Sequence, residues 1–415
     1  MVEIVKRTRY APSPTGMMHI GNSRSCILSY LFSKANNGEF ILRIDDTDAE
    51  RSHESFEEQI YKDLKWLQIS YHKKIKQSER KQIYEEYFNK LKDLKYIYAC
   101  YEKEDELQET SIYNRKSYYL TPIEKQKLEE NTKPHWRFFM KKDVYKMHDE
   151  VLGDIKIKRS WSDPIIKRTD GSFTYNFTSA VDDYLEKITD IIRSMEHLKN
   201  TFIQQEIIEA FNENYQIKFY HLPLIVDMKG EKLSKRKGNL SLITLKEEGI
   251  HYLSIFSFVT SLGTKNNPLI TSNKNDFIDY LCLSSFSRSS PKFSKDILEN
   301  INKKIIKQLS KEEIKLLGFN EKIWNITKDN LKNLKEYYEW KNILDNEVFF
   351  GEFQYIKELK NLYREYGIDF FLYIHESIKK DFLRNLRFFL TNKYFGPEIK
   401  KIFEYKLPLL KKNIL

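Results

Sequence analysis

Residues 9–21 combine side chains and turns that suit the binding of a phosphate. The stretch RYAPSPTGMMHIG contains Pro12 and Pro14, which stop any helix and hold the chain extended. It ends with His19 and Gly21 at the start of a segment with helical spacing of apolar residues. Unpaired backbone N–H groups and the dipole at a helix N-terminus attract anions. His19 would add a hydrogen-bond donor to this site, and Gly21 would let a flat ring approach the backbone.

A second stretch with charged side chains at close spacing is Lys232-Leu233-Ser234-Lys235-Arg236. It follows a predicted turn at residues 227–231 and precedes Gly238. A run of Lys and Arg is most often a solvated surface loop, and the run alone does not decide against that interpretation.

Short strands and helices that alternate along the chain must position the residues of these stretches. The β-branched residues within 2–9 predict a buried strand, and the apolar spacing after Gly21 predicts a helix that ends at Asn37-Gly38. Residues 39–44 (EFILRI) predict a second strand, which brings the acidic group Asp45-Asp46-Thr47-Asp48 to its C-terminal end. Ligands of open α/β sheets bind at this edge. The alternative role for the acidic group is capping of a helix within 49–67 by Asp48 or Ser52.

Composition sets broad limits on the class of protein. The chain has 415 residues, a formal net charge of +10 and 14% aromatic residues. This length allows several domains, and the aromatic content argues against disorder. There is no apolar run of transmembrane length and no signal-peptide pattern, and three distant cysteines suit a reducing cytosol. The positive charge fits a polyanionic partner such as RNA, but Lys is abundant throughout the chain.

The order of the motifs APSPTG, HIG and KLSKR resembles the two halves of a class I aminoacyl-tRNA synthetase site. The stretch up to Ser52, ending in LRIDDTDAERS, resembles bacterial-type glutamyl-tRNA synthetases in particular. The resemblance implies an α/β fold in which a Rossmann-like parallel-sheet catalytic domain is split by an α+β insertion and followed by an all-α anticodon-binding region. The implied parts are residues 1–75 with 164–240 (catalytic), 76–163 (acceptor-end insertion), 241–300 (stem contact) and 301–415 (anticodon binding).

The resemblance also assigns roles to individual residues. Catalysis is assigned to His19, Lys232 and Lys235. The implied ATP-binding residues are His19, Gly21, Glu196, Lys232, Ser234, Lys235 and Arg236. The implied glutamate-binding residues are Arg9, Ala11, Ser13, Asp45, Tyr175, Ser179 and Arg193. Two guanidinium groups would bind a γ-carboxylate far better than an amide.

Two of these assignments have a specific weakness. Asp45 stands where the family usually has Glu, so its carboxylate is retracted by about 1.5 Å, one carbon–carbon bond. A shifted backbone or a water molecule would then have to complete the reach. For Arg193 the alternative role is a salt bridge with Asp182 or Asp190.

The rest of the chain is predicted from local patterns. Asp170-Gly171 between β-rich runs predicts a hairpin turn, and residues 188–196 predict a strand that reaches Arg193. Residues 219–226 predict a buried strand, and residues 284–293 resemble a linker toward the anticodon end. Helices are predicted at 55–67, 83–97, 201–211, 240–248, 252–262, from 297 to 309, and at 331–344, 353–366 and 370–378.

The implied cofactors are ATP and Mg²⁺, without zinc. Cys100 is followed by Tyr101 and Glu102, and no second cysteine precedes Cys282, whereas a zinc site needs about four ligands. The implied partners are L-glutamate and tRNA(Glu) and/or tRNA(Gln), with no membrane contact, for a monomer in the cytoplasm.

Three other functions are compatible with parts of the sequence. A glutaminyl-tRNA synthetase has a similar acidic motif, but that family ends in β-barrels, whereas helices are predicted for the C-terminal third. A glutamyl-queuosine tRNA-modifying enzyme lacks an anticodon domain and has a degraded KLSKR motif. A non-catalytic tRNA-binding paralogue would not need the intact His19, Lys232 and Lys235.

Overall fold

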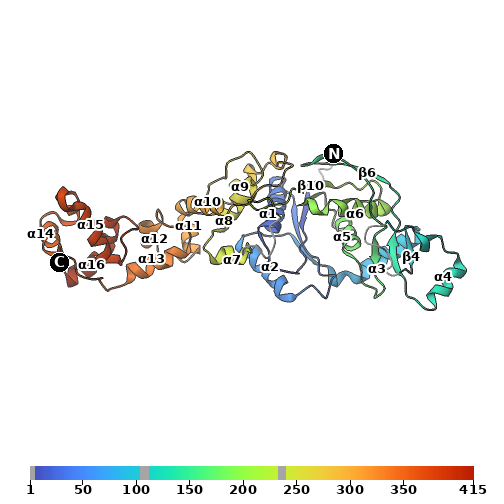
Figure 1. Ribbon diagram of the computed structural model, residues 1–415, viewed down its shortest axis with the longest axis horizontal. Coiled ribbons are helices and arrows are strands. Elements are labelled where there is room, and N and C mark those ends of the chain that lie inside the picture. The colour runs from blue at the N-terminus through green and yellow to red at the C-terminus, as the bar shows by residue number, and fades with distance from the viewer. Residues whose placement is uncertain (1–4, 103–111, 232–239) are drawn as a thin grey trace. The chain divides into compact units, whose positions relative to one another are not determined.

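The computed structural model describes residues 5–102, 112–231 and 240–415. The chain forms two compact units, which are labelled by element in Figure 1. Unit 1 comprises Met1–Ile243, Phe256–Leu269 and Asn275–Ser294. Unit 2 comprises Thr244–Ile255, Ile270–Lys274 and Lys295–Leu415. None of the helices in the described part of the chain is long and apolar enough to cross a membrane.

A parallel sheet forms the centre of unit 1. Its strands are β1 (Arg7–Tyr10), β2 (Glu39–Ile44), β3 (Lys73–Lys76), β9 (Asp190–Ser194) and β10 (Lys218–Leu222). Parallel pairing gives the groups β1-β2-β3 and β10-β9, and the N–H of Thr189 donates to the carbonyl of Arg7 (3.0 Å) where the two groups adjoin. The order is therefore β3-β2-β1-β9-β10, and the expected Rossmann-like sheet is confirmed.

Helices cover this sheet. They are α1 (Ile20–Ala35), α2 (Glu54–Trp66), α5 (Tyr175–Leu185) and α6 (Leu198–Phe211). Helix α1 lies against the strands in Figure 1, and Asn37 takes a left-handed φ of 49° just after it, as the sequence predicted. The helix α5 was missed, because the predicted hairpin occupied the residues that lead into it.

Several predicted boundaries near the sheet are wrong. The first strand begins at Arg7, since Val5 is 50% exposed and lies outside it, and residues 1–4 lie outside the described part. Helix α2 has His53 at its N-cap without a side-chain bond, so neither Asp48 nor Ser52 caps it. Strand β10 ends at Leu222, because the next residue is a proline with no N–H to donate.

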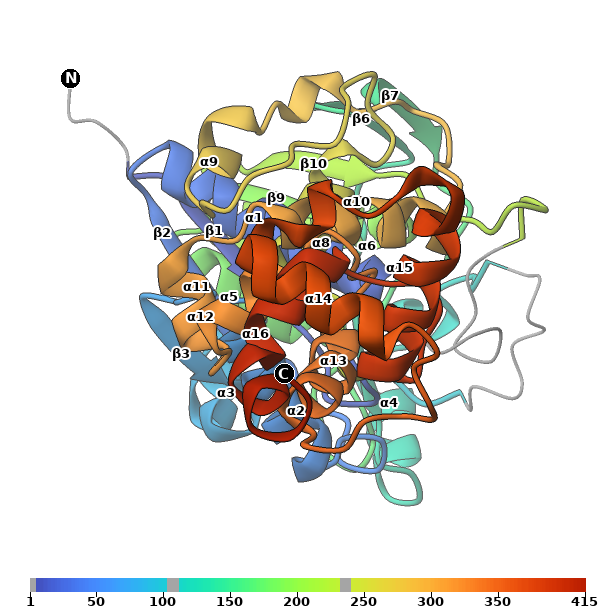
Figure 2. The ribbon, with the colours of Figure 1, turned by 90° about the vertical axis from the view of Figure 1, so that its left-hand side faces the viewer.

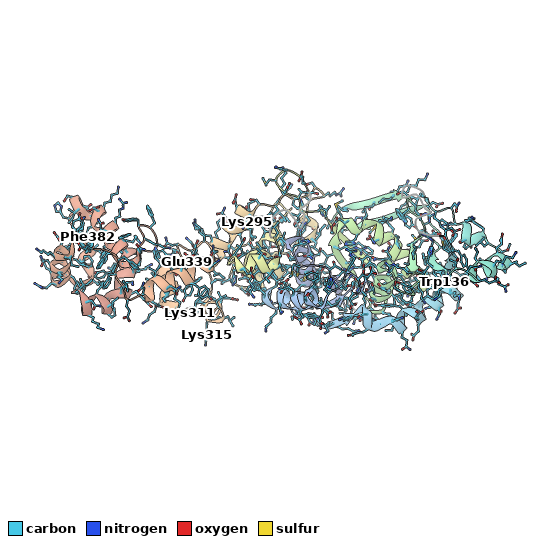
Figure 3. The ribbon with its side chains drawn as sticks, turned by 60° about the horizontal axis from the view of Figure 1, so that its bottom comes forward. Trp136, Lys295, Lys311, Lys315, Glu339 and Phe382 are labelled. Carbon is cyan, nitrogen blue, oxygen red and sulfur yellow. The ribbon has the colours of Figure 1, made fainter. Side chains whose placement is uncertain are left out.

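An antiparallel region lies between β3 and α5 in the sequence. It contains η1 (Gln77–Arg80), α3 (Lys81–Asp93), β4 (Ile97–Cys100), η3 (Lys116–Tyr119), α4 (Pro122–Glu129), β5 (His135–Phe138), β6 (Val144–Asp149), β7 (Gly153–Lys158) and β8 (Ile165–Lys167). Strands β4, β5 and β8 form one sheet and β6-β7 a hairpin, and Trp136 of β5 is labelled in Figure 3.

The helix predicted at 83–97 stops at Asp93, since Lys95 has a left-handed φ of 57° and Ile97 already pairs in β4. The turn at Asp170-Gly171 is confirmed by a φ of 86° at Gly171 and a Lys167–Phe173 bridge.

Unit 2 is helical, as predicted for the C-terminal third, and Figure 2 labels its helices, which are coloured orange to red. Its helices include α10 (Lys295–Lys307), α11 (Lys311–Leu316), α12 (Glu321–Thr327), α13 (Lys335–Asp345), α14 (Ile356–Tyr366), η6 (Gly367–Leu372), α15 (Glu376–Thr391) and α16 (Ile399–Asn413). Phe382 of α15, labelled in Figure 3, is fully buried against Phe353 and Phe370. The helix predicted at 370–378 is wrong. A 3-10 turn occupies 367–372, and α15 starts only after His375, whose ring accepts the Ser377 N–H.

The predicted helices at 240–248 and 252–262 are present as α7 (Leu242–Glu247) and α8 (Tyr252–Ser261), and residues of each belong to both units. Residues 284–293 contain the end of the short turn η5 (Leu283–Ser285) and a parallel bridge from Lys292 to Val226, and α9 (Asp276–Tyr280) precedes them.

Asn302 of α10 joins three segments of unit 2. Its Oδ1 accepts the backbone N–H of His251 (2.8 Å) and the hydroxyl of Ser254 (2.8 Å). Its amide donates to the carbonyls of Gly249 (3.3 Å) and Lys332 (3.1 Å). Because Asn302 is fully buried, water cannot replace these four bonds when the side chain is removed.

We expect Asn302→Ala to lower the free energy of unfolding by roughly 2–4 kcal/mol, since several buried polar groups lose their partner. Thermal unfolding followed by circular dichroism measures this change. Asn413→Ala is the control, because Asn413 is exposed and its amide contacts only the carbonyl of Leu409 in its own helix. Equal melting temperatures for the two variants would contradict the structural role of Asn302.

Candidate functional site

A cavity of about 810 Å³ opens in unit 1 where β1 and β9 end and α1 begins. This is the edge at which open α/β sheets bind ligands. Eight of the residues that the sequence nominated line it: Arg9, Ala11, Ser13, His19, Gly21, Tyr175, Arg193 and Glu196. The structure therefore brings together most of the nominated residues that it describes.

His19 forms the N-cap of α1. Its Nδ1 accepts the backbone N–H of Gly21 (3.0 Å), and the Asn22 side chain accepts the backbone N–H of His19 (2.6 Å). With Nδ1 as an acceptor, the proton of the neutral ring is on Nε2, which makes Nε2 a donor. A Cβ atom on Gly21 would lie 2.9 Å from Cε1 of His19, so glycine is needed here for the imidazole ring itself. The predicted anion site is thus a helix N-terminus with an oriented histidine.

The chain that follows the KLSKR motif pairs with the His19 segment. Lys232, Ser234, Lys235 and Arg236 themselves lie outside the described residues. The N–H of Ile20 donates to the carbonyl of Leu240 (3.2 Å), and the N–H of Leu242 donates to the carbonyl of Met18 (2.8 Å). The chain therefore resumes at the cavity, where Leu240 is one of the lining residues.

Arg193 carries a buried charge that no carboxylate in the described residues neutralises within 4 Å. Its guanidinium donates to the neutral oxygens of Gln204 (Oε1, 2.9 Å) and Thr201 (Oγ1), and its buried Nε has no hydrogen-bond partner among the described residues. The proposed salt bridges are absent, because Asp190 pairs with Lys6 and Asp182 with Arg80.

Burial lowers the pKa of Arg193 to about 10, so the group is still charged at neutral pH. A cation in this state favours an anionic ligand, which would replace the lost hydration.

Arg43 is a second buried arginine, and its charge is fully paired. Its Nε donates to Asp45 (2.6 Å) and its NH1 to Asp183 (2.6 Å). Asp183 also accepts from Arg9 (3.2 Å). Asp45 and Ser179 do not line the cavity, and Ser179 accepts a bond from Arg43 (3.2 Å). These two nominated residues therefore lie behind the cavity wall.

Sequence reasoning missed Arg43 and Asp183. The available signals were a lone charge inside the apolar strand EFILRI and the tandem acids Asp182-Asp183 in an apolar helix. His197 lines the cavity beside Tyr175, with ring centroids 6.0 Å apart. Its burial, together with the charges of Arg193 and Arg9, lowers its pKa to about 4, so the ring is neutral at pH 7.

The surroundings of Cys100 do not suit a zinc ion. Its thiol contacts Glu102 (3.2 Å), and Nε of Arg137 donates to the sulfur (3.4 Å) and to Nε2 of His135 (3.1 Å). A guanidinium that holds both candidate ligands would repel a cation.

Comparison with known proteins gives a consistent result. The family profile "tRNA synthetases class I (E and Q), catalytic domain" matches residues 5–300. The chain is 35% identical to glutamate–tRNA ligase 1 of Rickettsia bellii, covering 98% of this chain and 97% of the relative. It is 38% identical to glutamate–tRNA ligase 1 of Rickettsia massiliae over 80% of this chain and 78% of that one. The crystal structure of glutamate–tRNA synthetase from Elizabethkingia anophelis superposes with a TM-score of 0.79, at 25% identity, covering 99% of this chain and all of that chain.

The lowered pKa of His197 predicts a dependence of stability on pH. The unfolded ring has a pKa of about 6.5, so between pH 4 and 6.5 the unfolded chain binds more protons than the folded chain. His197 therefore lowers stability as the pH falls through this window, and its effect vanishes above it. We expect the melting temperature of His197→Gln to fall less than that of the wild type between pH 7 and pH 5.

The control is His148→Gln, because His148 is exposed and its pKa is raised by Asp154, which is the opposite direction. Its acid sensitivity should not be reduced. Parallel melting curves for wild type and His197→Gln across pH 5, 6 and 7 would show that His197 is not held neutral by burial.

Proposed function

The chain belongs to the class I aminoacyl-tRNA synthetases for glutamate and glutamine, and we propose that the cavity at the end of β1 and β9 is its aminoacylation site. Its activity is that of a glutamate–tRNA ligase, which uses ATP to join glutamate to tRNA. The relatives that carry this name span nearly the whole chain.

The uncompensated charge of Arg193 is the observation that carries the assignment of the pocket. A γ-carboxylate can supply the missing anion, whereas the neutral amide of glutamine would leave the buried guanidinium unpaired. Arg9 lines the same cavity but already shares Asp183. We therefore assign the main side-chain contact to Arg193 and a supporting contact to Arg9, with Tyr175, Ala11 and Ser13 forming the walls.

The N-terminus of α1 suits the triphosphate of ATP. In the proposed first step, a carboxylate oxygen of glutamate attacks the α-phosphorus and the bond to the β-phosphate oxygen breaks, releasing pyrophosphate. His19 and the backbone N–H groups at the N-terminus of α1 would stabilise the charge on one side of the phosphates, and Gly21 and Glu196 line the same cavity. Lys232, Ser234, Lys235 and Arg236 would serve the other side, with Mg²⁺ bound to the ATP phosphates.

In the second step, a hydroxyl of the 3′-terminal adenosine of tRNA attacks the acyl carbon, and AMP leaves. No protein nucleophile is required in either step, so catalysis rests on alignment and charge stabilisation.

Asp45 and Ser179 need an intermediary if they act on glutamate. The Asp45 carboxylate is bound by Arg43, and burial raises its pKa to about 6. We propose that a water molecule relays its contact to the α-ammonium group, because the shorter side chain does not reach the cavity wall.

The remaining proposals concern partners and setting. We propose that the helices of unit 2 bind the anticodon of tRNA(Glu), that the protein is a cytoplasmic monomer, and that it binds no zinc. The Arg137 contacts to Cys100 and His135 support the last point.

We expect Arg193→Lys to raise the KM for glutamate roughly tenfold to a hundredfold, because hydrogen bonds to charged groups contribute about 1.5–3 kcal/mol and an ammonium cannot reproduce the guanidinium fork. The KM for ATP should be nearly unchanged. Aminoacylation with radiolabelled glutamate measures both values. Arg168→Lys, an exposed arginine of unit 1 outside the cavity, is the control. An unchanged glutamate KM would remove Arg193 from the pocket.

Charging of two unmodified transcripts identifies the tRNA. We expect tRNA(Glu) to accept glutamate. Charging of tRNA(Gln) as well would show a non-discriminating enzyme, which feeds an amidation route. Charging of neither would contradict the proposed function, and it would favour a tRNA-modifying enzyme that needs a modified base or a non-catalytic tRNA-binding paralogue.

A further inference from the structure

A chain of buried side chains lies behind Arg193, on the side away from the cavity. We propose that Asp149, His221 and Thr201 are positioning residues that orient the Arg193 guanidinium toward the substrate while leaving its charge available. The inference rests on the proposed contact between Arg193 and the glutamate side chain, and the test below separates the two.

Three elements bring these residues together. His221 of β10 is the register partner of Arg193 of β9 in the parallel sheet. Thr201 and Gln204 are one turn apart on α6, so both face the guanidinium. Asp149 is the last residue of β6. The two hydrogen-bond partners of Arg193, Thr201 and Gln204, are at most 2% exposed, and His221 and Asp149 behind Thr201 are fully buried. The hydrogen bonds among these residues are therefore shielded from solvent.

The hydrogen bonds of Asp149 fix the proton positions. Its carboxylate accepts the backbone N–H groups of Val151 (3.0 Å), Leu152 (2.8 Å) and His221 (3.1 Å), and it contacts Nδ1 of His221 at 2.6 Å. These donors, with the histidine, hold the pKa of Asp149 below its usual value despite its burial, so it is an anion at neutral pH. An anion at this place requires the proton on Nδ1 of His221.

The other end of the histidine ring then sets the direction of the Thr201 hydroxyl. Burial lowers the pKa of His221, which keeps the ring neutral and makes Nε2 an acceptor. Nε2 lies 2.8 Å from Oγ1 of Thr201, so the hydroxyl donates to it and turns its lone pairs to the NH2 group of Arg193. The competing acceptor is the carbonyl of His197 at 3.1 Å, which the hydroxyl would take if Nε2 carried a proton.

The hydrogen-bonded series Asp149–His221–Thr201, here called the relay, differs from a direct ion pair in how it affects the charge of Arg193. Arg43, two bonds of which go to carboxylates at 2.6 Å, has no charge left for a ligand. Arg193 meets only neutral oxygens, and the nearest anion of the relay is separated from it by an imidazole and a hydroxyl. Because Coulomb attraction falls with distance, the relay holds the guanidinium in place yet leaves a substrate carboxylate as its best partner.

The alternative is that the network only satisfies buried polar groups and stabilises the fold. A purely structural role would change stability without a selective effect on glutamate. The KM for glutamate, measured beside the KM for ATP and kcat, separates the two roles.

The experiment compares three variants of the full chain in tRNA(Glu) charging. Thr201→Val removes the hydroxyl at nearly constant shape, and Thr201→Ser keeps it. Thr327→Val is the matched control, because Thr327 is also fully buried on a helix but its hydroxyl contacts only backbone carbonyls of that helix. Melting temperatures of all variants are recorded in parallel.

We expect Thr201→Val to raise the glutamate KM about tenfold, the value of one hydrogen bond to a charged group, with the ATP KM and kcat within about twofold of wild type. Thr201→Ser should restore most of the affinity, and Thr327→Val should lower only the melting temperature. Asp149→Asn is the second test should Thr201→Val not fold. The amide NH2 of the introduced asparagine would face either the His221 ring or the His221 backbone N–H, both of which need an acceptor. We therefore expect the same selective rise in the glutamate KM.

An unchanged glutamate KM in folded Thr201→Val or Asp149→Asn overturns the positioning role. If Arg193→Lys still raises the glutamate KM in that case, the proposed pocket stands and only the relay fails. If Arg193→Lys also has no effect, the proposed pocket itself is wrong.

Discussion

The burial of several charged arginine side chains away from solvent is the constraint on which the rest of unit 1 depends. Arg9, Arg24, Arg43 and Arg193 are each at most 5% exposed. Desolvation of such a group costs several kcal/mol unless other groups replace its hydration. Arg43 satisfies this with two carboxylates, and Arg24 with the carbonyls of Pro223 and Leu262 at 3.0 Å each. Arg24 and Arg193 both combine neutral acceptors with a buried Nε that has no hydrogen-bond partner among the described residues, and both line the cavity. Arg24 is held at the start of α1, whereas Arg193 lies at the end of β9 beside Arg9, Tyr175 and Ser13 of the cavity lining.

In the proposed reaction, the two kinds of anion would be bound by different interactions. The α1 terminus offers backbone N–H groups and a dipole, which suit a flexible polyphosphate that must be bound and then released as pyrophosphate. Arg193 offers a full charge in a rigid fork, which suits one planar carboxylate and rejects an amide. Arg24 leaves α1 and contacts the two chain segments after β10 and α8, so it also fixes α1 relative to the end of β10. The position of the proposed phosphate site therefore depends on another buried guanidinium.

Much of this could be predicted from the sequence, because local patterns determine it. The spacing that gives α1, the strand EFILRI and the placement of His19 and Gly21 at a helix start are local signals, whereas Arg193 was nominated through the resemblance to a known family. The partners of the arginines were not predicted, since Arg43–Asp183 and Arg193–Thr201 pairs depend on which helix face packs on which strand. The same reason explains the wrong capping role of Asp48 and Ser52. Several side chains could cap α2, and tertiary contacts decided that none does.

The exchange of the family's usual glutamate for Asp45 gains a physical meaning from these contacts. Arg43 lies on β2 and Asp45 directly follows this strand, two residues further on, and the Asp45 carboxylate lies 2.6 Å from the Arg43 guanidinium. The backbone N–H of Asp45 meanwhile donates to the carbonyl of Pro12 (3.0 Å), between the wall residues Ala11 and Ser13. Asp45 therefore supports the cavity wall through its main chain, while its side chain holds Arg43 behind that wall.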